Sequence, residues 1–283
     1  MVKSLIPAER HQRIQALLET RLVASIADLS ELLGVSEATI RRDLETLEER
    51  GLLERTHGGA ILTRRLPNEP VYALSAAVHP EEKRRIGAAA AALVEEGDTV
   101  FINSGTTTTE VMRHLADRTD LGRATILTTN LGGVLDLHHP GLEVVLLGGS
   151  FRPESKAVVG EAALRALRQV YADKSFLGVD GFSLKCGLTT PVQAEAEIAR
   201  LMLGRTRGAA VVVADSSKWG VVSNYEIGSL EQVRILVSDA GLSAGAVDEL
   251  AAHGLRVVCA DDDRSLALAA PVGAGLEDPN GHH

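Results

Sequence analysis

The chain has 283 residues, of which 45% are hydrophobic and 24% charged, which is typical of a soluble globular protein with room for two domains. No apolar run approaches the ~20 residues that span a bilayer, and the polar start predicts no export signal. We therefore expect a cytoplasmic protein that does not bind a membrane. The two cysteines, Cys186 and Cys259, fit a reducing compartment, and no cysteine or histidine spacing resembles a zinc site.

The N-terminal segment has the pattern of a helix-turn-helix. Pro7 opens a predicted helix, in whose first turn proline is tolerated. Ser25 caps a second predicted helix, and Gly34 ends it, as glycine commonly does at a helix C-terminus. Only Gly34 and Val35 separate this helix from Ser36, which caps a third. Two short helices joined by a tight glycine turn predict a helix-turn-helix.

The third helix has the composition of a DNA-recognition helix. Ile40, Leu44 and Leu47 share one face at the 3.6-residue period, so that face is expected to be buried. Arginine can bind a guanine edge or a phosphate, and threonine can hydrogen-bond or touch a thymine methyl. Asp43 lies about 60° from the buried stripe, so we expect it to partner an arginine of the first helix. The predicted DNA contacts are Ser36, Ala38, Thr39, Arg41 and Arg42; the alternative is a surface helix with solvated charges.

A hairpin is predicted after the third helix. Leu52–Thr56 and Ala60–Thr63 flank His57-Gly58-Gly59, and two glycines between short extended runs favour a hairpin, the wing of a winged helix-turn-helix. Arg55 and His57 are the predicted wing contacts with a phosphate or the minor groove. For His57 the alternative is a turn residue that bonds its own backbone.

Charge is divided unevenly along the chain. Residues 1–65 hold ten basic and ten acidic residues, so the net charge of −9 belongs to the remainder. DNA-binding domains often carry a net positive charge, but the N-terminal segment does not. DNA binding would rest on a few placed arginines, and the acidic remainder would leave only the N-terminal end to approach DNA.

A second domain is predicted at residues 81–261, after a DNA-binding domain at 1–63 and a proline-containing linker at 64–80. Apolar runs alternate there with helical ones, which favours an α/β fold with a mostly parallel sheet. Residues 262–283, polar and small, are predicted to be a disordered tail. The predicted helices are Glu81–Glu96, Thr107–Arg118, Gly160–Tyr171 and Pro191–Arg205. The predicted strands are Thr99–Asn103, Thr125–Asn130, Glu143–Leu147, Lys174–Val179, Ala209–Ala214, Arg234–Ser238 and Arg256–Ala260.

Polar groups follow several of these strands, where ligands bind in α/β sheets. After the first strand, glycine, hydroxyls and a helix N-terminus favour an anion site at Ser104, Gly105, Thr106, Thr107 and Thr108, the alternative being a Ser/Thr-rich helix cap. Neither the dinucleotide fingerprint nor the P-loop is present. Lys218 could meet a phosphate, or lie solvated at the surface. Asp180 and Glu195 could accept sugar hydroxyls. The remaining residues predicted in this pocket are Asn130, Gly148 and Gly149.

These motifs resemble those of the DeoR-type transcriptional regulators over nearly the whole chain. One departure is Asn103, where the family usually has aspartate. The N-terminal match is Arg10, Ile14, Leu18, Ser36-x-x-Thr39-Ile40-Arg41-Arg42-Asp43-Leu44 and His57-Gly58-Gly59-Ala60. In the second domain it is Ser104-Gly105-Thr106-Thr107, Thr129-Asn130, Leu147-Gly148-Gly149, Gly187-Leu188-Thr189 and Asp215-Ser216-Ser217-Lys218.

The resemblance implies a sugar-responsive regulator, usually a repressor, of carbohydrate catabolism in bacteria. Its fold would be a winged helix-turn-helix followed by a Rossmann-like α/β sensor domain that resembles ribose-5-phosphate isomerase. The implied effector is a phosphorylated sugar at Ser104–Thr108, with no other cofactor. We expect a homo-oligomer, a dimer or tetramer, on double-stranded operator DNA. The alternative is an isomerase-like enzyme with an appended DNA-binding domain and Glu195 as its base. A sensor that acts only through protein partners would leave Arg41 and Arg42 unexplained.

Overall fold

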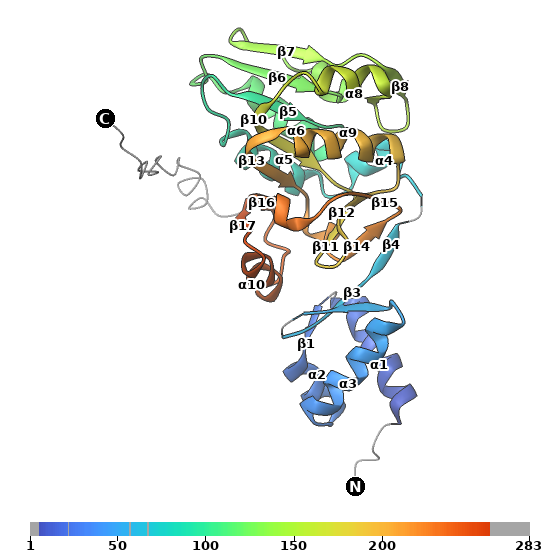
Figure 1. Ribbon diagram of the computed structural model, residues 1–283. Coiled ribbons are helices and arrows are strands. Elements are labelled where there is room, and N and C mark those ends of the chain that lie inside the picture. The colour runs from blue at the N-terminus through green and yellow to red at the C-terminus, as the bar shows by residue number, and fades with distance from the viewer. Residues whose placement is uncertain (1–5, 22, 57, 67, 261–283) are drawn as a thin grey trace, which may run out of the picture.

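The computed structural model describes residues 6–260 except Leu22, His57 and Pro67. The tail predicted at 262–283 lies outside the described residues. Within these ranges no helix is long and apolar enough to cross a membrane. Figure 1 shows two parts, a small N-terminal one and a larger one built around a twisted sheet.

The N-terminal part is a three-helix winged domain. Its elements are α1 (Pro7–Arg21), β1 (Val23–Ser25), α2 (Ile26–Leu33), α3 (Glu37–Glu49), β2 (Leu53–Arg55) and β3 (Gly59–Leu62). The Ser25 hydroxyl accepts from the Asp28 amide at 3.0 Å, and Gly34 ends α2 with φ 64°. Strands β2 and β3 form the predicted antiparallel hairpin, and β1 pairs with the other edge of β3. The predicted helix-turn-helix and hairpin are therefore confirmed.

The larger part contains a parallel sheet in the order β17-β16-β13-β10-β5-β6-β7. All seven predicted strands are in it: β5 (Thr99–Ile102), β6 (Ala124–Thr128), β7 (Leu142–Leu146), β10 (Ala172–Gly178), β13 (Thr206–Val213), β16 (Ile235–Ser238) and β17 (Arg256–Cys259). The chain starts at β5, runs outward to β7, and then returns to β10 on the other side of β5. The strand order therefore reverses between β5 and β10.

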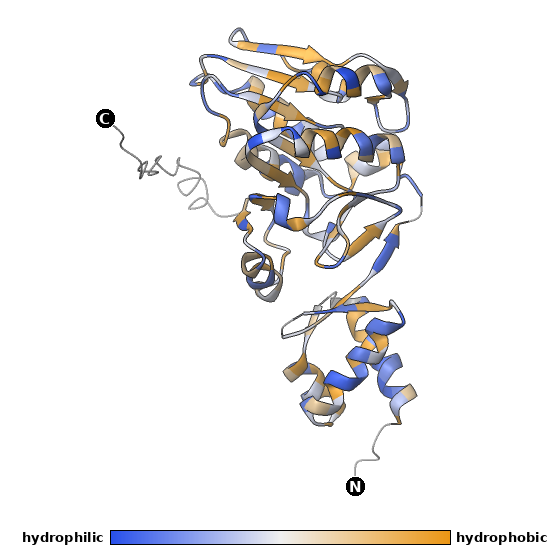
Figure 2. Cartoon of the chain, in the orientation of Figure 1, coloured by the Kyte–Doolittle hydropathy of each residue, from blue (hydrophilic) through white to orange (hydrophobic). Residues whose placement is uncertain are grey.

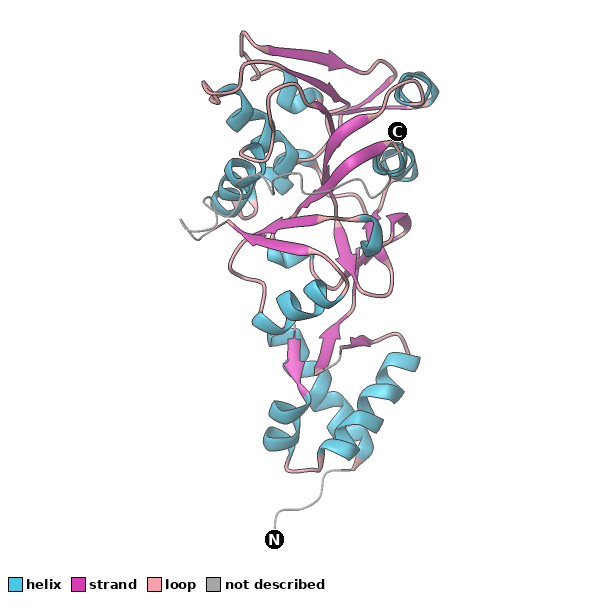
Figure 3. Cartoon of the chain, turned by 60° about the vertical axis from the view of Figure 1, so that its left-hand side comes forward, coloured by secondary structure: helices cyan, strands magenta, loops and turns pink. Residues whose placement is uncertain are grey.

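Helices cover both faces of this sheet (Figures 1 and 3). On one face α5 (Pro80–Ala91) and α6 (Thr106–Ala116) share an apolar cluster with Val100, Ile102 and Val211; the short α7 (Leu131–Val134) lies beside α6. On the other face α8 (Glu161–Leu167), α9 (Gln193–Gly204) and α10 (Ala244–Ala252) pack against Phe101 and Val212. Successive strand residues thus enter opposite cores, as the two-residue period requires. Figure 2 shows these strands as largely hydrophobic.

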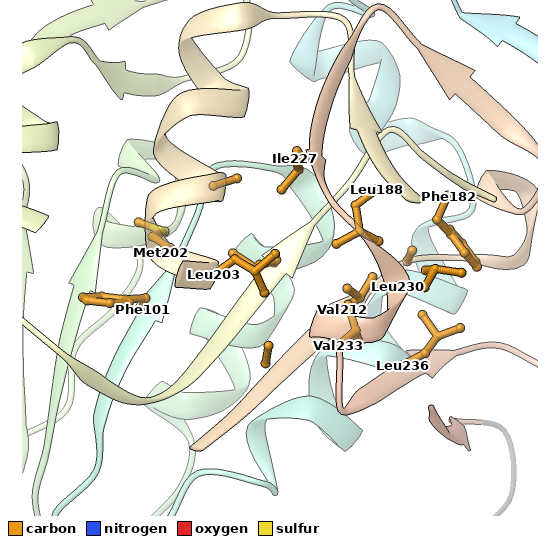
Figure 4. Close-up of a cluster of buried hydrophobic side chains, with 14 of the residues drawn as sticks. Phe101, Phe182, Leu188, Met202, Leu203, Val212, Ile227, Leu230, Val233 and Leu236 are labelled. Carbon is orange, nitrogen blue, oxygen red and sulfur yellow. The ribbon is translucent and has the colours of Figure 1, made fainter. Parts of the chain in front are cut away.

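Short strands extend the second core beyond the sheet. Figure 4 shows Phe182, Leu188 and Ile227 beside Leu203 and Val212. They come from an antiparallel sheet of β11 (Gly181–Ser183), β12 (Gly187–Thr190) and β15 (Tyr225–Gly228). A separate hairpin consists of β8 (Ser150–Arg152) and β9 (Ala157–Val159). The short 3-10 turns are η1 (Ser216–Lys218) and η2 (Leu230–Gln232).

The segment 64–80, predicted as a linker, contains regular structure. Strand β4 (Arg64–Leu66) pairs in parallel with β14 (Val221–Ser223), and α4 (Tyr72–Ala77) follows. The prolines of this segment suggested irregular structure, but they fall outside both elements. We call its described residues from 64 to 78 the connector, because β4 continues directly from the wing strand β3.

The two parts also touch beside the connector. Gly220 has φ 74°, and a Cβ there would stand 2.8 Å from the Leu62 carbonyl oxygen. The carboxyl group of Glu54, on β2, is buried against the Ser183 hydroxyl and the backbone of Leu184 and Lys185. Burial raises the pKa of Glu54, and the hydrogen bond from Ser183 opposes that shift. The DNA-binding domain is thus seated on the turn between β11 and β12.

Candidate recognition helix and ligand pocket

Helix α3 has the predicted division between a buried and an exposed face. Ile40, Leu44 and Leu47 are buried, and Ser36 caps the helix by accepting from the Thr39 amide at 3.3 Å. Figures 1 and 3 show the helices of this domain on the side away from the sheet domain. Of the predicted DNA contacts, Thr39 is half-buried, and the others on this helix are exposed: Ser36, Ala38, Arg41 and Arg42.

Arg41 and Arg42 differ in their local partners. The Arg41 guanidinium is 2.8 Å from Glu37, one turn back, and both side chains are about half exposed. Exposed pairs of this kind are worth only about 0.3–0.5 kcal/mol, so DNA could displace Glu37 at little cost. Arg42 is exposed opposite the buried face. The wing residue Arg55 is exposed and lies 3.9 Å from Glu45 of α3, while His57 lies outside the described residues.

Asp43 is a structural residue of the domain, as predicted. Its carboxylate receives two hydrogen bonds from Arg10 of α1, at 2.7 and 2.9 Å, and lies 3.0 Å from the His11 ring. Burial by itself raises the pKa of Asp43, but the hydrogen bonds from Arg10 and His11 outweigh it and hold the pKa below its ordinary value. This two-pronged ion pair fixes α1 against the recognition helix.

A cavity of about 280 Å³ lies where the strand order reverses. Asn103, after β5, joins the two central strands there: its side chain donates to the Gly178 carbonyl oxygen at 2.9 Å and accepts from the Gly178 amide at 2.8 Å. An ionised aspartate could not donate the first of these bonds. The cavity thus has the position at which open α/β sheets bind ligands.

One end of the cavity suits an anion. The first turn of α6 opens onto it through Ser104–Thr107, and a helix N-terminus presents unpaired amides and a positive dipole. Lys218 and Lys83 also line it. Burial lowers the pKa of Lys83, the carboxylate of Asp215 opposes that shift, and the ammonium of Lys218 adds to it. An anion between the two lysines would relieve their mutual repulsion.

Carboxylates also line the cavity, and Glu195 lies 3.5 Å from the Ser104 hydroxyl. Glu195 accepts from the Ser155 hydroxyl at 2.6 Å and from Arg152 Nε at 3.3 Å. Burial raises the pKa of Glu195; Ser155 opposes the shift, and the charges of Glu69 and Asp180 add to it. Asp180 in turn accepts from the Thr190 hydroxyl at 2.8 Å. Carboxylate oxygens in such a setting can accept hydrogen bonds from the hydroxyls of a ligand.

The structure brings together most of the predicted pocket residues, namely Ser104, Gly105, Thr106, Thr107, Asp180, Glu195 and Lys218. Thr108 is buried and donates to the Asn103 carbonyl oxygen at 2.9 Å. Asn130 is buried and donates to the Gly105 carbonyl oxygen at 3.1 Å. Thr108 and Asn130 therefore hold the backbone of the loop and do not line the cavity. Gly148 and Gly149 do not line the cavity. They follow the edge strand β7, two strands from β5 and thus about 10 Å away.

Sequence reasoning missed several pocket residues. Lys83, Ser155 and Thr190 line the cavity, and so do Glu69 and Tyr72 of the connector. The turn Asp215–Lys218 at a strand end was a usable signal for Asp215, because it already marked Lys218. No such signal marked Lys83, a single lysine in an alanine-rich helix, or Glu69 and Tyr72, which lie in the predicted linker.

Two family models match the chain. Residues 10–65 match the DeoR-like helix-turn-helix domain, and residues 78–240 match the DeoR C terminal sensor domain. The HTH-type transcriptional regulator GlpR of Haloferax volcanii is 38% identical over 90% of this chain and 98% of its own length. The transcriptional repressor AccR of Agrobacterium fabrum is 34% identical over 82% of this chain and 90% of its own.

Solved structures give a more distant likeness. The ribose 5-phosphate isomerase of Methanocaldococcus jannaschii has a TM-score of 0.37 and 16% identity, over 50% of this chain and 54% of that one. A similarity of this size supports no functional inference. The sheet order and the family models, by contrast, describe an α/β domain behind a helix-turn-helix.

Proposed function

Because this chain belongs to the DeoR family of transcriptional regulators, we propose that it represses genes of carbohydrate catabolism under the control of a phosphorylated sugar. It acts in the cytoplasm on double-stranded operator DNA, as a dimer or tetramer, so that two recognition helices reach neighbouring major-groove segments of a roughly palindromic site. The sugar phosphate binds one conformation better than the other, and this difference in affinity shifts the population that can bind DNA.

The observation that carries the effector proposal is the polarity of the pocket. A loop at a helix N-terminus, Lys83 and Lys218 line one cavity together with the carboxylates of Glu195 and Asp180. A sugar phosphate has the matching division, with a dianionic phosphate at one end and hydroxyl donors at the other. A simple anion would leave the carboxylates without ligand donors, and a neutral sugar would leave the lysines without an anionic partner.

The exposed face of α3 supports the DNA-binding part of the proposal. Arg41 and Arg42 stand free of the apolar core on the helix that follows the glycine turn, which is the usual position of base and phosphate contacts in this motif. Asp43 is removed from the set of contacts by its pair with Arg10. We propose that Ser36, Ala38, Thr39, Arg41, Arg42 and the wing residues Arg55 and His57 contact DNA.

The relatives named above are regulators and not enzymes. The alternative function, an isomerase with Glu195 as its base, therefore has no support from them. In the pocket, Glu195 is engaged by Ser155 and Arg152, an arrangement that suits a binding residue. We accordingly assign Glu195 to recognition of ligand hydroxyls.

A thermal-shift screen against a panel of sugar phosphates tests the effector proposal. A ligand of the native state at 100 times its Kd stabilises by about 2.7 kcal/mol, which raises the melting temperature of a domain of this size by roughly 5–10 °C. We expect at least one member of the panel to give such a shift and its unphosphorylated sugar to give none. A panel without any shift would contradict the proposal.

Thr107→Asp is expected to abolish the effector shift without loss of DNA binding. Thr107 is buried at the first turn of α6 and lines the anion end of the cavity, so a carboxylate there would repel a phosphate. Aspartate is itself well accommodated in the first turn of a helix. The measurement is the thermal shift with the active sugar phosphate.

The matched control is Thr119→Asp. Thr119 is exposed beyond the other end of α6, so this variant adds the same charge away from the cavity and should respond as the wild type does. A normal effector shift in Thr107→Asp would show that the loop does not bind the phosphate.

A further inference from the structure

The connector forms one wall of the ligand pocket. Seven of its residues line the cavity, Glu69 and Tyr72 among them. At its other end β4 continues from wing strand β3, and the Arg64 amide donates to the Gly220 carbonyl oxygen at 2.9 Å. A ligand in the pocket would therefore contact the connector, which is the covalent link to the DNA-binding domain.

A charged bridge fastens this wall to the pocket. Arg152, on β8, pairs through Nη2 with Glu69 of the connector and through Nε with Glu195 Oε1 at 3.3 Å. The Glu195 contact is the longer one, and it lies on a carboxylate oxygen that Ser155 already engages at 2.6 Å. Glu69 and Glu195 both line the cavity, and the contact of Arg152 with Glu195 is the weaker of the two.

Other contacts hold the connector at its far end. The Tyr72 hydroxyl lies 2.8 Å from the Thr109 hydroxyl, and Lys83 donates to the Val78 carbonyl oxygen at 2.6 Å. His79, directly after this end, has the left-handed backbone (φ 51°) that side chains other than glycine rarely adopt. The connector therefore ends at a turn whose backbone conformation is uncommon for a residue other than glycine.

The contact between the two domains is incomplete beside the connector. A second cavity, of about 350 Å³, separates the β1–β3 sheet from α10 and is lined by Gly59, Ile61, Ala246 and Glu249 among others. This open cleft contributes no packing contacts to that part of the interface. Beside this cleft, the connector holds the DNA-binding domain together with the contacts of Glu54 and Leu62.

We propose that the Arg152 bridge between Glu69 and Glu195 transmits occupancy of the pocket to the DNA-binding domain. A ligand hydroxyl that donates to Glu195 replaces Arg152 there, and Arg152 then moves outward with Glu69 and the connector. A phosphate group alone does not trigger the movement, because the Glu195 carboxylate repels its negative charge. This inference rests on the proposed function, since it takes the ligand to be a sugar phosphate.

Amide hydrogen exchange of the full chain tests the bridge with the isosteric variant Glu69→Gln. Without ligand, the amides of residues 68–78 are expected to exchange about tenfold faster in this variant, because one charge-assisted hydrogen bond no longer holds them. Glu161→Gln is the control, since Glu161 is an exposed carboxylate of α8 that pairs with Arg168 and its loss should leave the exchange unchanged. Equal exchange in Glu69→Gln and wild type would overturn the proposal.

Ligand arms of the same experiment use ribose 5-phosphate and inorganic phosphate. Ribose 5-phosphate should speed exchange at residues 68–78 in the wild type while protecting residues 106–109, and it should add little to Glu69→Gln. Inorganic phosphate should protect 106–109 only. A bound sugar phosphate, seen as a thermal shift, that leaves residues 68–78 unchanged would overturn the bridge. If no sugar phosphate binds, the proposed function fails, and the bridge is then judged by the Glu69→Gln variant alone.

Discussion

Asp43→Ala is expected to destabilise the DNA-binding domain by about 3–5 kcal/mol, the usual cost of removing one partner from a buried ion pair. The Arg10 and Asp43 side chains are only 10% and 7% exposed, so the remaining guanidinium would be buried without its countercharge. Because domains of this size are stable by roughly 5 kcal/mol, the variant should be largely unfolded in this domain at 37 °C. Chemical denaturation followed by circular dichroism measures the loss.

The control for this variant lies on the same helix. Glu37→Ala removes a carboxylate from an arginine pair that is about half exposed on both sides, so we expect a cost below about 1 kcal/mol. The two variants thus separate a buried from an exposed pair. If Asp43→Ala cost no more than Glu37→Ala, the pair with Arg10 would not hold α1 against α3.

The same pair predicts how the stability of the domain depends on pH. It holds the pKa of Asp43 below its ordinary value, so the folded state binds this proton less readily than the unfolded state does. Its stabilisation is complete above the ordinary carboxylate pKa of about 4 and is lost as the pH falls through the lowered value. Asp43→Ala should therefore show a weaker loss of stability on acidification than the wild type.

Arg42→Ala should weaken operator binding by about 1–3 kcal/mol, which is the usual cost of losing an arginine contact with a base. The prediction follows from the exposed position of Arg42 opposite the buried Ile40 and Leu44. Fluorescence anisotropy with DNA from upstream of the regulated genes measures the affinity. A base contact would also relax sequence choice at one position, whereas a phosphate contact would lower the salt slope by about 1.

Arg84→Ala is the matched control for Arg42→Ala. Arg84 is exposed on α5 of the sensor domain, so this variant removes the same charge far from α3. It should bind operator DNA as the wild type does. Equal affinity in Arg42→Ala and wild type would mean that another face of the domain meets the DNA.

Periodicity and cap residues were sufficient to predict the main elements. The seven long apolar runs each became a strand of the parallel sheet, and Ser25, Gly34 and Ser36 mark helix ends where the structure has them. The helical period predicted that Asp43 pairs with an arginine of the first helix, and the structure shows that this arginine is Arg10. Strands of three or four residues, such as β8, β11 and β14, are too short for alternation to distinguish them from loops.

The pocket was only partly predictable because its residues depend on strand order. Sequence places Gly148 and Asp180 alike at strand ends, but only the second lies beside the reversal between β5 and β10. In the same way the run of threonines does not say which hydroxyls face the cavity. Thr107 does so, whereas Thr108 is turned into the core by the helix. The connector escaped prediction because the contacts that join it to the pocket, such as Glu69 with Arg152 and Tyr72 with Thr109, link residues distant in the chain.

The most direct test of the central claim is the affinity for operator DNA, measured by fluorescence anisotropy with and without each sugar phosphate that gives a thermal shift. We expect at least one of them to change the apparent Kd by about tenfold or more, within the range of typical allosteric couplings, and Thr107→Asp to bind DNA with the same affinity in its presence and absence. A sugar phosphate that binds the protein while the affinity for DNA stays constant would contradict the account.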